Sequence, residues 1–102
     1  MSLDTFERVF TNILNDQRLS VCHISIYMTL ILLWHKNELA NPFPVSRKCI
    51  MELAHVRSIV TYHKCIAQLQ MYGYIRYNPS YSYYKRSTIF LDKPIKCDLF
   101  FQ

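Results

Sequence analysis

Four cysteines and four histidines are the side chains of this sequence best suited to metal binding or nucleophilic chemistry. They are Cys22, Cys49, Cys65, Cys97, His23, His35, His55 and His63. No two cysteines form a Cys-x-x-Cys pair, so the spacing matches neither a zinc finger nor a thioredoxin-like redox motif. The nearest mixed pairs are Cys22 with His23 and His63 with Cys65, and residues one or two positions apart on a helix point in different directions. We therefore expect no metal site, and thiols that are reduced and buried.

Catalysis and nucleotide chemistry are not predicted either. No histidine stands at a spacing that would activate Cys65, and the seven acidic residues form no paired carboxylates. Gly73 is the single glycine, whereas Rossmann fingerprints and phosphate-cradling loops need several glycines for close backbone approach. We expect a protein that is not an enzyme, takes no cofactor and has no small-molecule effector.

Basic residues are concentrated in one part of the chain. The formal net charge is +5, yet residues 1–45 contain three basic and four acidic residues, a net of −1. Residues 46–86 contain seven basic residues and one acidic residue, a net of +6. The seven are Arg47, Lys48, Arg57, Lys64, Arg76, Lys85 and Arg86. A polyanion would bind to this half, and the alternative is a solvated basic face.

Length and composition indicate one folded domain. The chain has 102 residues, of which 51% are hydrophobic, too many for a disordered protein. The longest apolar run, residues 24–34, is shorter than the roughly 18–20 residues needed to cross a bilayer, and residues 1–20 show no secretory pattern. The sequence therefore predicts a cytoplasmic protein with no membrane partner.

Two helices are predicted in the first third of the chain. Apolar residues recur every three or four positions over residues 3–15, which is typical of an amphipathic helix. This stripe consists of Leu3, Phe6, Val9, Phe10, Ile13 and Leu14. Ser20 is the expected N-cap of a second helix that ends near Lys36. That helix is apolar nearly all round, so it must be covered on most of its faces.

A shorter pair of helices follows a proline-containing segment. Residues 41–45 contain two prolines and are expected to form a loop that ends in a short extended stretch. Ser46 is then the N-cap of a helix over 47–54, and Ser58 is the N-cap of another helix that ends before Gly73. The inward residues are predicted to be Ile50, Met51, Leu53 and Ala54 in the first helix and Tyr62, Cys65, Ile66 and Leu69 in the second.

Beyond Gly73 the apolar period changes from about 3.6 to 2. Residues 74–77 and 88–91 are rich in β-branched and aromatic residues, and a polar, tyrosine-rich loop separates them. This pattern predicts a two-stranded β-hairpin. The apolar tail, with Leu99, Phe100 and Phe101, is expected to pack on the body or on a partner.

Residues 20–91 show the element order of a winged helix-turn-helix, and two segments carry the resemblance. In Val45–Ala54 a Leu-Ala pair ends the first helix, and Ser58–Ile75 is a serine-led helix leading to Gly-Tyr-Ile at the first wing strand. These segments resemble winged-helix regulators of bacteria and phage. Residues 61–65, Thr-Tyr-His-Lys-Cys, resemble short proteins associated with mobile elements in Bacteroidetes.

The resemblance implies an α+β, mainly helical fold. Residues 1–18 would form an extra N-terminal helix, residues 19–92 a three-helix winged-helix core with a two-stranded wing, and residues 93–102 a C-terminal tail. The helix that starts at Ser58 would be the recognition helix, since the major groove of DNA is about 12 Å wide and accepts one α-helix.

The predicted DNA-binding residues fall into three groups. The recognition helix would present Ser58, Ile59, Val60, Thr61, His63 and Lys64. Arg47, Lys48 and Arg57 would contact phosphates. The wing would contribute Tyr83, Tyr84, Lys85 and Arg86, with a solvated loop as the alternative. Ile59 or Val60 would contact a thymine methyl, whereas the arginines often found at these positions in similar proteins are missing, which argues against strong guanine readout.

The sequence thus predicts sequence-specific binding of double-stranded DNA, by a transcriptional regulator or by an accessory factor of a mobile element. The alternative is a winged-helix module that docks proteins without binding DNA. A homodimer is expected through the Leu3–Leu14 stripe and the Leu99–Phe101 tail, which would present two recognition helices to a two-fold site. The other interpretation is that these residues complete the core of the monomer.

Overall fold

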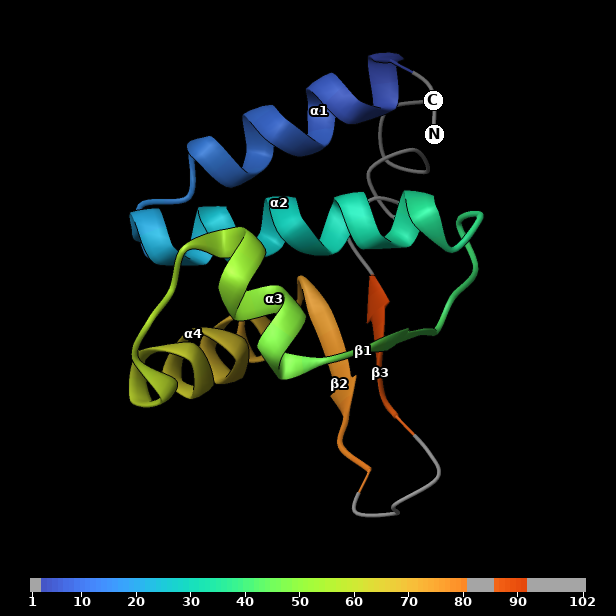
Figure 1. Ribbon diagram of the computed structural model, residues 1–102. Coiled ribbons are helices and arrows are strands. Elements are labelled where there is room, and N and C mark those ends of the chain that lie inside the picture. The colour runs from blue at the N-terminus through green and yellow to red at the C-terminus, as the bar shows by residue number, and fades with distance from the viewer. Residues whose placement is uncertain (1–2, 81–85, 92–102) are drawn as a thin grey trace.

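The computed structural model describes residues 3–80 and 86–91, and they form a mainly helical α+β domain (Figure 1). The elements are α1 (Leu3–Leu14), α2 (Val21–Lys36), β1 (Phe43–Val45), α3 (Arg47–Ala54), α4 (Ile59–Met71), β2 (Ile75–Asn78) and β3 (Ser87–Leu91). The four helices and the hairpin strands lie within one or two residues of their predicted bounds. The mainly helical α+β class is therefore confirmed.

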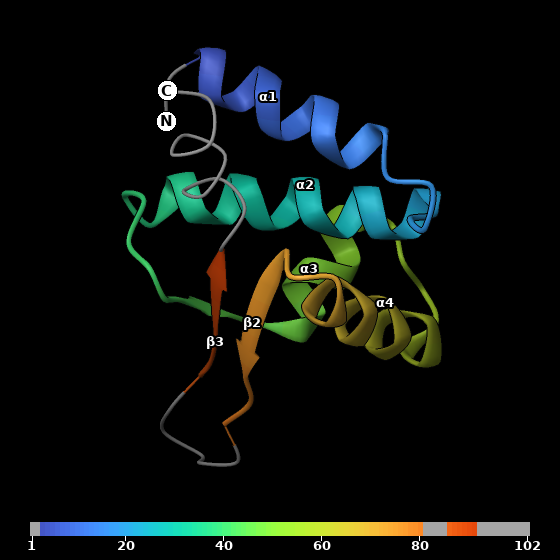
Figure 2. The same ribbon diagram turned by 180° about the vertical axis from the view of Figure 1, so that it is seen from behind.

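Helix α2 is the centre of the domain. Figures 1 and 2 show α1 on one side of it, with α3, α4 and the sheet on the other. Its buried residues are His23, Ile26, Tyr27, Thr29, Leu30, Ile31 and Trp34. The prediction that most faces of this helix are covered is confirmed, although Val21 is 82% exposed and Leu32 is 44% exposed.

The sheet has three antiparallel strands in the order β1-β3-β2, so the predicted two-stranded hairpin was incomplete. The extended stretch after Pro42 is strand β1, and Phe43 pairs with Ile89 of β3. Phe43 and Val45 are buried while Pro44 between them is exposed. A proline is tolerated there because β1 is an edge strand, where a missing N–H breaks no ladder on the outer side.

Local sequence signals set the ends of α3 and α4 as predicted. The Ser46 side chain accepts a hydrogen bond from the backbone N–H of Cys49 at 3.4 Å, and Ser58 accepts one from Thr61 at 3.2 Å. Both bonds satisfy amide groups that a helix start leaves without a partner. Gly73 follows α4 with φ of +83°, the left-handed conformation that glycine adopts without strain.

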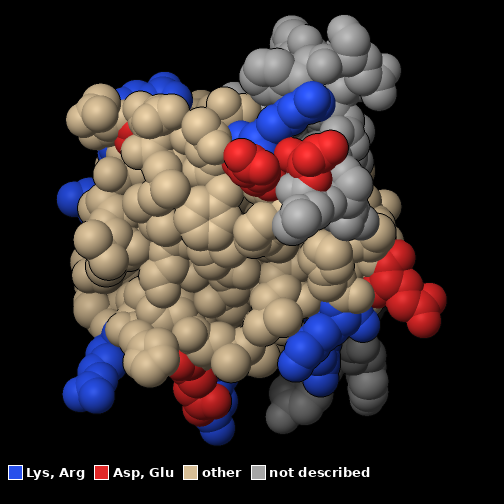
Figure 3. All heavy atoms as spheres, turned by 90° about the horizontal axis from the view of Figure 1, so that it is seen from above, with Lys and Arg blue, Asp and Glu red and all other residues tan. Residues whose placement is uncertain are grey.

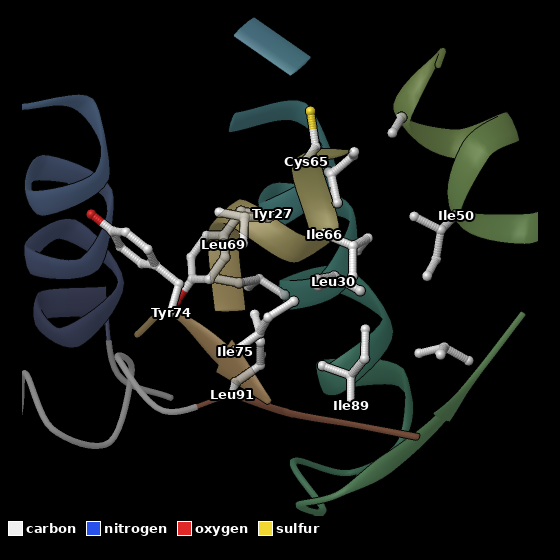
Figure 4. Packing of buried hydrophobic residues seen from close by; sticks show 14 of the residues in the cluster. Tyr27, Leu30, Ile50, Cys65, Ile66, Leu69, Tyr74, Ile75, Ile89 and Leu91 are labelled. Carbon is white, nitrogen blue, oxygen red and sulfur yellow. The ribbon is translucent and has the colours of Figure 1, made fainter. Parts of the chain in front are cut away.

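The hydrophobic core lies between α2, α4 and the sheet (Figure 4). Tyr27, Leu30 and Leu69 from the two helices meet Ile89 from the sheet, and all four are fully buried. Leu53 was expected to face inward but is 46% exposed. The buried face of α3 belongs to Ile50 and Ala54, which are four residues apart, so the side chain of Leu53 points to one side of it.

Helix α1 contributes its own apolar stripe to this core. Val9 is 3% exposed and Ile13 is fully buried, whereas Leu14 at the end of the helix is 54% exposed. The central part of the predicted stripe therefore completes the core within the chain. The Leu99–Phe101 tail lies outside the described residues.

A polar contact joins the α1–α2 connection to the turn between α4 and β2. Asp16 Oδ2 accepts a hydrogen bond from the Tyr74 hydroxyl at 2.7 Å. It also forms a salt bridge with Arg18 Nη2 at 2.7 Å. The Arg18 guanidinium lies over the Tyr72 ring, 4.2 Å from its centre. Hydrogen bonding from Arg18, followed by that from Tyr74, holds the pKa of Asp16 well below its usual value.

Candidate nucleic-acid interface

Two basic side chains stand at the start of α3. Strand β1 leads directly into this helix, and Ser46 caps it. Arg47 and Lys48 occupy the first turn, and both are exposed. The free amide groups and the positive end of the helix dipole at this position favour an anion, as the two side chains also do.

A tight connection places the start of α4 next to α3. His55 has φ of +61°, which turns the chain, and the N–H of Val56 donates to the carbonyl of Met51 at 3.0 Å. Val56 is buried and anchors the connection, whereas Arg57 is exposed. The orientation of α4 relative to α3 is therefore set by backbone hydrogen bonding and by burial of one side chain.

An open pocket of about 580 Å³ lies at this junction. It is lined by Arg47, Lys48, Met51, Glu52, His55, Val56, Arg57 and Ile59. Three of these residues are cations and one is a carboxylate, so the lining has a net positive charge, and Met51, Val56 and Ile59 add apolar surface to it. The structure thus brings together all three predicted phosphate-contacting residues, which are separated by up to ten positions in the sequence.

Helix α4 has a buried face and an exposed face, as predicted. Tyr62, Cys65, Ile66 and Leu69 are buried. Burial raises the pKa of Tyr62 to about 12 and also raises the pKa of the Cys65 thiol. The residues predicted to face DNA, Ser58, Ile59, Val60, His63 and Lys64, are exposed, and Thr61 is half-buried.

The glutamines of α4 have structural partners that the sequence analysis missed. Gln68 Oε1 lies 2.6 Å from Nε2 of the buried His23, and Gln70 Oε1 accepts a hydrogen bond from the backbone N–H of Tyr77 at 2.7 Å. Gln68 and His23 are 45 positions apart, so no local pattern in the sequence predicts this contact.

The β2–β3 hairpin carries one described residue of the predicted wing contacts. Arg86 is exposed, while Tyr83, Tyr84 and Lys85 lie outside the described residues. Ser87 Oγ accepts a hydrogen bond from the backbone N–H of Ser80 at 3.0 Å, which joins the two sides of the hairpin. Figures 1 and 2 place the hairpin and α4 on the same side of α2, opposite α1.

The face formed by α1 and α2 has a different character. Figure 3 looks onto this side and shows a broad area without charged side chains, with acidic and basic side chains beside it and other lysines and arginines at its margin. Asp4 and Glu7 of α1 are exposed. Leu14, Val21 and Leu32 are the large hydrophobic residues of these two helices that are exposed. The basic pocket at α3 and α4 and this broad uncharged area are thus on different sides of the domain.

Metal-binding side chains do not converge in the part of the chain that the structure describes. Within that part no three of the His, Cys, Asp and Glu residues lie close enough together to hold an ion. Cys22, Cys49 and Cys65 are free thiols, although only Cys65 is fully buried. His23, which belongs to the Cys22–His23 pair noted in the sequence, makes hydrogen bonds with Ser20 and Gln68.

Over residues 3–80 and 86–91, no helix combines the length and the apolar character that a membrane span requires. Comparisons with known proteins were made for the whole chain. No family model matches it, and neither a curated protein nor a solved structure is similar enough to it to count as a match.

Proposed function

We propose that this protein is a winged helix-turn-helix protein that binds double-stranded DNA in a sequence-specific way, as a transcriptional regulator or an accessory factor of a mobile element. The observation that carries the proposal is the convergence of Arg47, Lys48 and Arg57 around the pocket at the start of α4. The order α2, β1, α3, α4, β2 and β3 supports it, because it follows the winged-helix order of the resemblance.

In the proposed complex α4 enters the major groove with its first two turns, and α3 crosses the phosphate backbone. Arg47 and Lys48 then bind phosphates together with the N-terminal amide groups of α3, and Arg57 binds a phosphate next to them. These contacts fix the position of the helix without reading the sequence. Lys64 and the side chains of the first turn of α4 contact the groove, and Arg86 contacts the flanking backbone.

Fluorescence anisotropy with a labelled duplex at about 50 and 200 mM salt tests this proposal. With four to six phosphate contacts, log K should fall against log salt with a slope of roughly −3.5 to −5.5. Lys64→Glu, or reversal of both Lys85 and Arg86, should weaken binding by about tenfold or more, because each replaces an attraction to the DNA with a repulsion.

Lys36→Glu is the matched control for these variants. Lys36 is exposed at the end of α2 and outside the basic pocket, so the same charge reversal there should leave most of the affinity intact. Circular dichroism of each variant shows that the fold is retained. Equal affinity of the Lys64→Glu protein and the unmodified protein would contradict the proposed interface.

The α1–α2 face, with its exposed Leu14, Val21 and Leu32, favours a second candidate function, self-association of the domain. We propose a second copy as its occupant, because residues 3–36 contain three basic and three acidic residues and so have no net charge, although the whole chain has a net charge of +5. A two-fold interface requires such a self-complementary patch. Sedimentation equilibrium at micromolar concentration should show a dimer that Val21→Glu dissociates, and a monomer at all concentrations would contradict this candidate.

A further inference from the structure

The residues that α4 offers to a DNA groove are unusual in their chemistry. Side chains that form two hydrogen bonds to a purine are arginine or lysine for guanine and asparagine or glutamine for adenine. Helix α4 spans Ile59–Met71 and contains no arginine and no asparagine. Its possible purine readers are therefore Lys64, Gln68 and Gln70.

Both glutamines already use the oxygen atom that adenine readout requires. The backbone N–H of Ser20 donates to His23 Nδ1 at 2.9 Å, so the protonated ring nitrogen is Nε2, and it donates to Gln68 Oε1 at 2.6 Å. Gln70 Oε1 accepts from the N–H of Tyr77. Turning Gln68 toward DNA would leave Nε2 of His23 without a hydrogen-bond partner, and this histidine is only 5% exposed.

The first turn of α4 instead presents branched aliphatic side chains. Val60 is 78% exposed and Ile59 is 48% exposed, although both are β-branched and apolar. His63 and Lys64 follow each of them by four positions and therefore lie on the same faces one turn later. The exposed surface of α4 thus begins with methyl groups and continues with basic and polar groups.

Thymine is the one base that matches this surface. Its C5 methyl is the apolar group that the major groove presents, and aliphatic side chains contact it. The N-terminal residues of a recognition helix are those that reach the base edges. The surrounding Arg47, Arg57 and Lys64 favour a polyanion over an apolar protein partner at this position.

We propose that Ile59 and Val60 read thymine through its methyl group, so that the preferred site of this protein contains thymines under the first turn of α4. This inference rests on the proposed function. In this arrangement the basic residues hold the helix in position, and the methyl contacts select the sequence.

The test begins with selection of the preferred duplex from a random pool by the full chain. Each thymine of the selected site is then replaced by deoxyuridine, which pairs identically with adenine but lacks the methyl group. Anisotropy titrations at one fixed salt concentration compare the duplexes. Removal of a contacted methyl should weaken binding by about fourfold, and thymines outside the site of contact should show no effect.

Variants then assign the effect to the two residues. Val60→Ser removes both methyl groups of the side chain, so it should reduce the ratio between the thymine and deoxyuridine affinities toward one. Met71→Ser is the control, because Met71 is an apolar residue that is 73% exposed at the other end of α4. This control should retain the full ratio. Ile59→Ser should reduce the ratio at a neighbouring thymine.

The outcomes separate the inference from the function on which it rests. A protein that binds no duplex even at about 50 mM salt overturns the proposed function and the inference together. A protein that binds DNA but selects a site without thymine, or binds thymine and deoxyuridine duplexes equally, overturns the inference alone. A methyl effect that persists in both serine variants overturns the assignment to Ile59 and Val60.

Discussion

His23 of α2 and Gln68 of α4 are joined by a hydrogen bond of 2.6 Å between Nε2 and Oε1. Nδ1 of the same imidazole accepts a hydrogen bond from the backbone N–H of Ser20, so one side chain caps α2 and holds α4 against it. The proposed recognition helix is therefore fixed to the centre of the domain by a buried polar contact as well as by apolar packing.

Replacing His23 by alanine should destabilise the fold. The change removes the part-buried hydrogen bonds to the Ser20 N–H and the Gln68 oxygen, and a hydrogen bond of this kind contributes about 0.5–1.5 kcal/mol. Urea unfolding followed by circular dichroism measures the loss. His35→Ala removes an exposed histidine of the same helix and should change the free energy of unfolding by about 0.5 kcal/mol or less. Equal stability of the two variants would show that the contact contributes nothing.

The domain should lose stability in acid because the carboxylate of Asp16 becomes protonated. Its pKa is lowered in the folded protein, chiefly by the Arg18 hydrogen bond, so its contribution is present above the pKa of the unfolded chain. This contribution is lost as the pH falls toward the folded-state pKa. Asp16→Asn should cost about 1 kcal/mol at neutral pH and should flatten the dependence of the urea midpoint on pH below about 5.

Glu7→Gln serves as the control for this pH dependence, since Glu7 is exposed on α1. Its curve should follow that of the unmodified protein. An Asp16→Asn curve that is parallel to the unmodified one over the acidic range would contradict the assigned role.

Gly73 should resist substitution because of its backbone conformation. A Cβ at this position meets no atom within 4 Å, so the cost of Gly73→Ala arises from the φ of +83° and not from a clash. A left-handed conformation costs about 1–2 kcal/mol for a residue with a Cβ. Thermal unfolding should show this loss, and Gly73→Asn should recover part of it because asparagine tolerates this region. A fully stable alanine variant would be inconsistent with the turn.

Neutralising the start of α3 should change the salt dependence of DNA binding more than its sequence preference. Each phosphate contact adds about 0.9 to the slope of log K against log salt, so Arg47→Ala with Lys48→Ala should lower the slope by about 2. The ranking of different duplexes should stay the same, because phosphate contacts carry no sequence information. An unchanged slope would place these two residues outside the interface.

The sequence determined the local elements of this protein. Ser46, Ser58 and Gly73 act on amide groups and dihedral angles within a few residues of themselves, so they marked the ends of α3 and α4 correctly. The 3.6-residue period likewise identified the buried face of α4 and, with it, the exposed Ile59, Val60, His63 and Lys64.

Only the tertiary structure decided the contacts between distant segments. Strand β1 pairs with β3, which lies more than forty residues later, and three residues around a proline carry no signal of that pairing. The exposure of Leu53 depends on how α3 is rotated against α2, and the hydrogen bond of Gln68 depends on a histidine 45 positions earlier. Periodicity reports which side of an element is apolar, whereas its neighbours are chosen by packing of the whole chain.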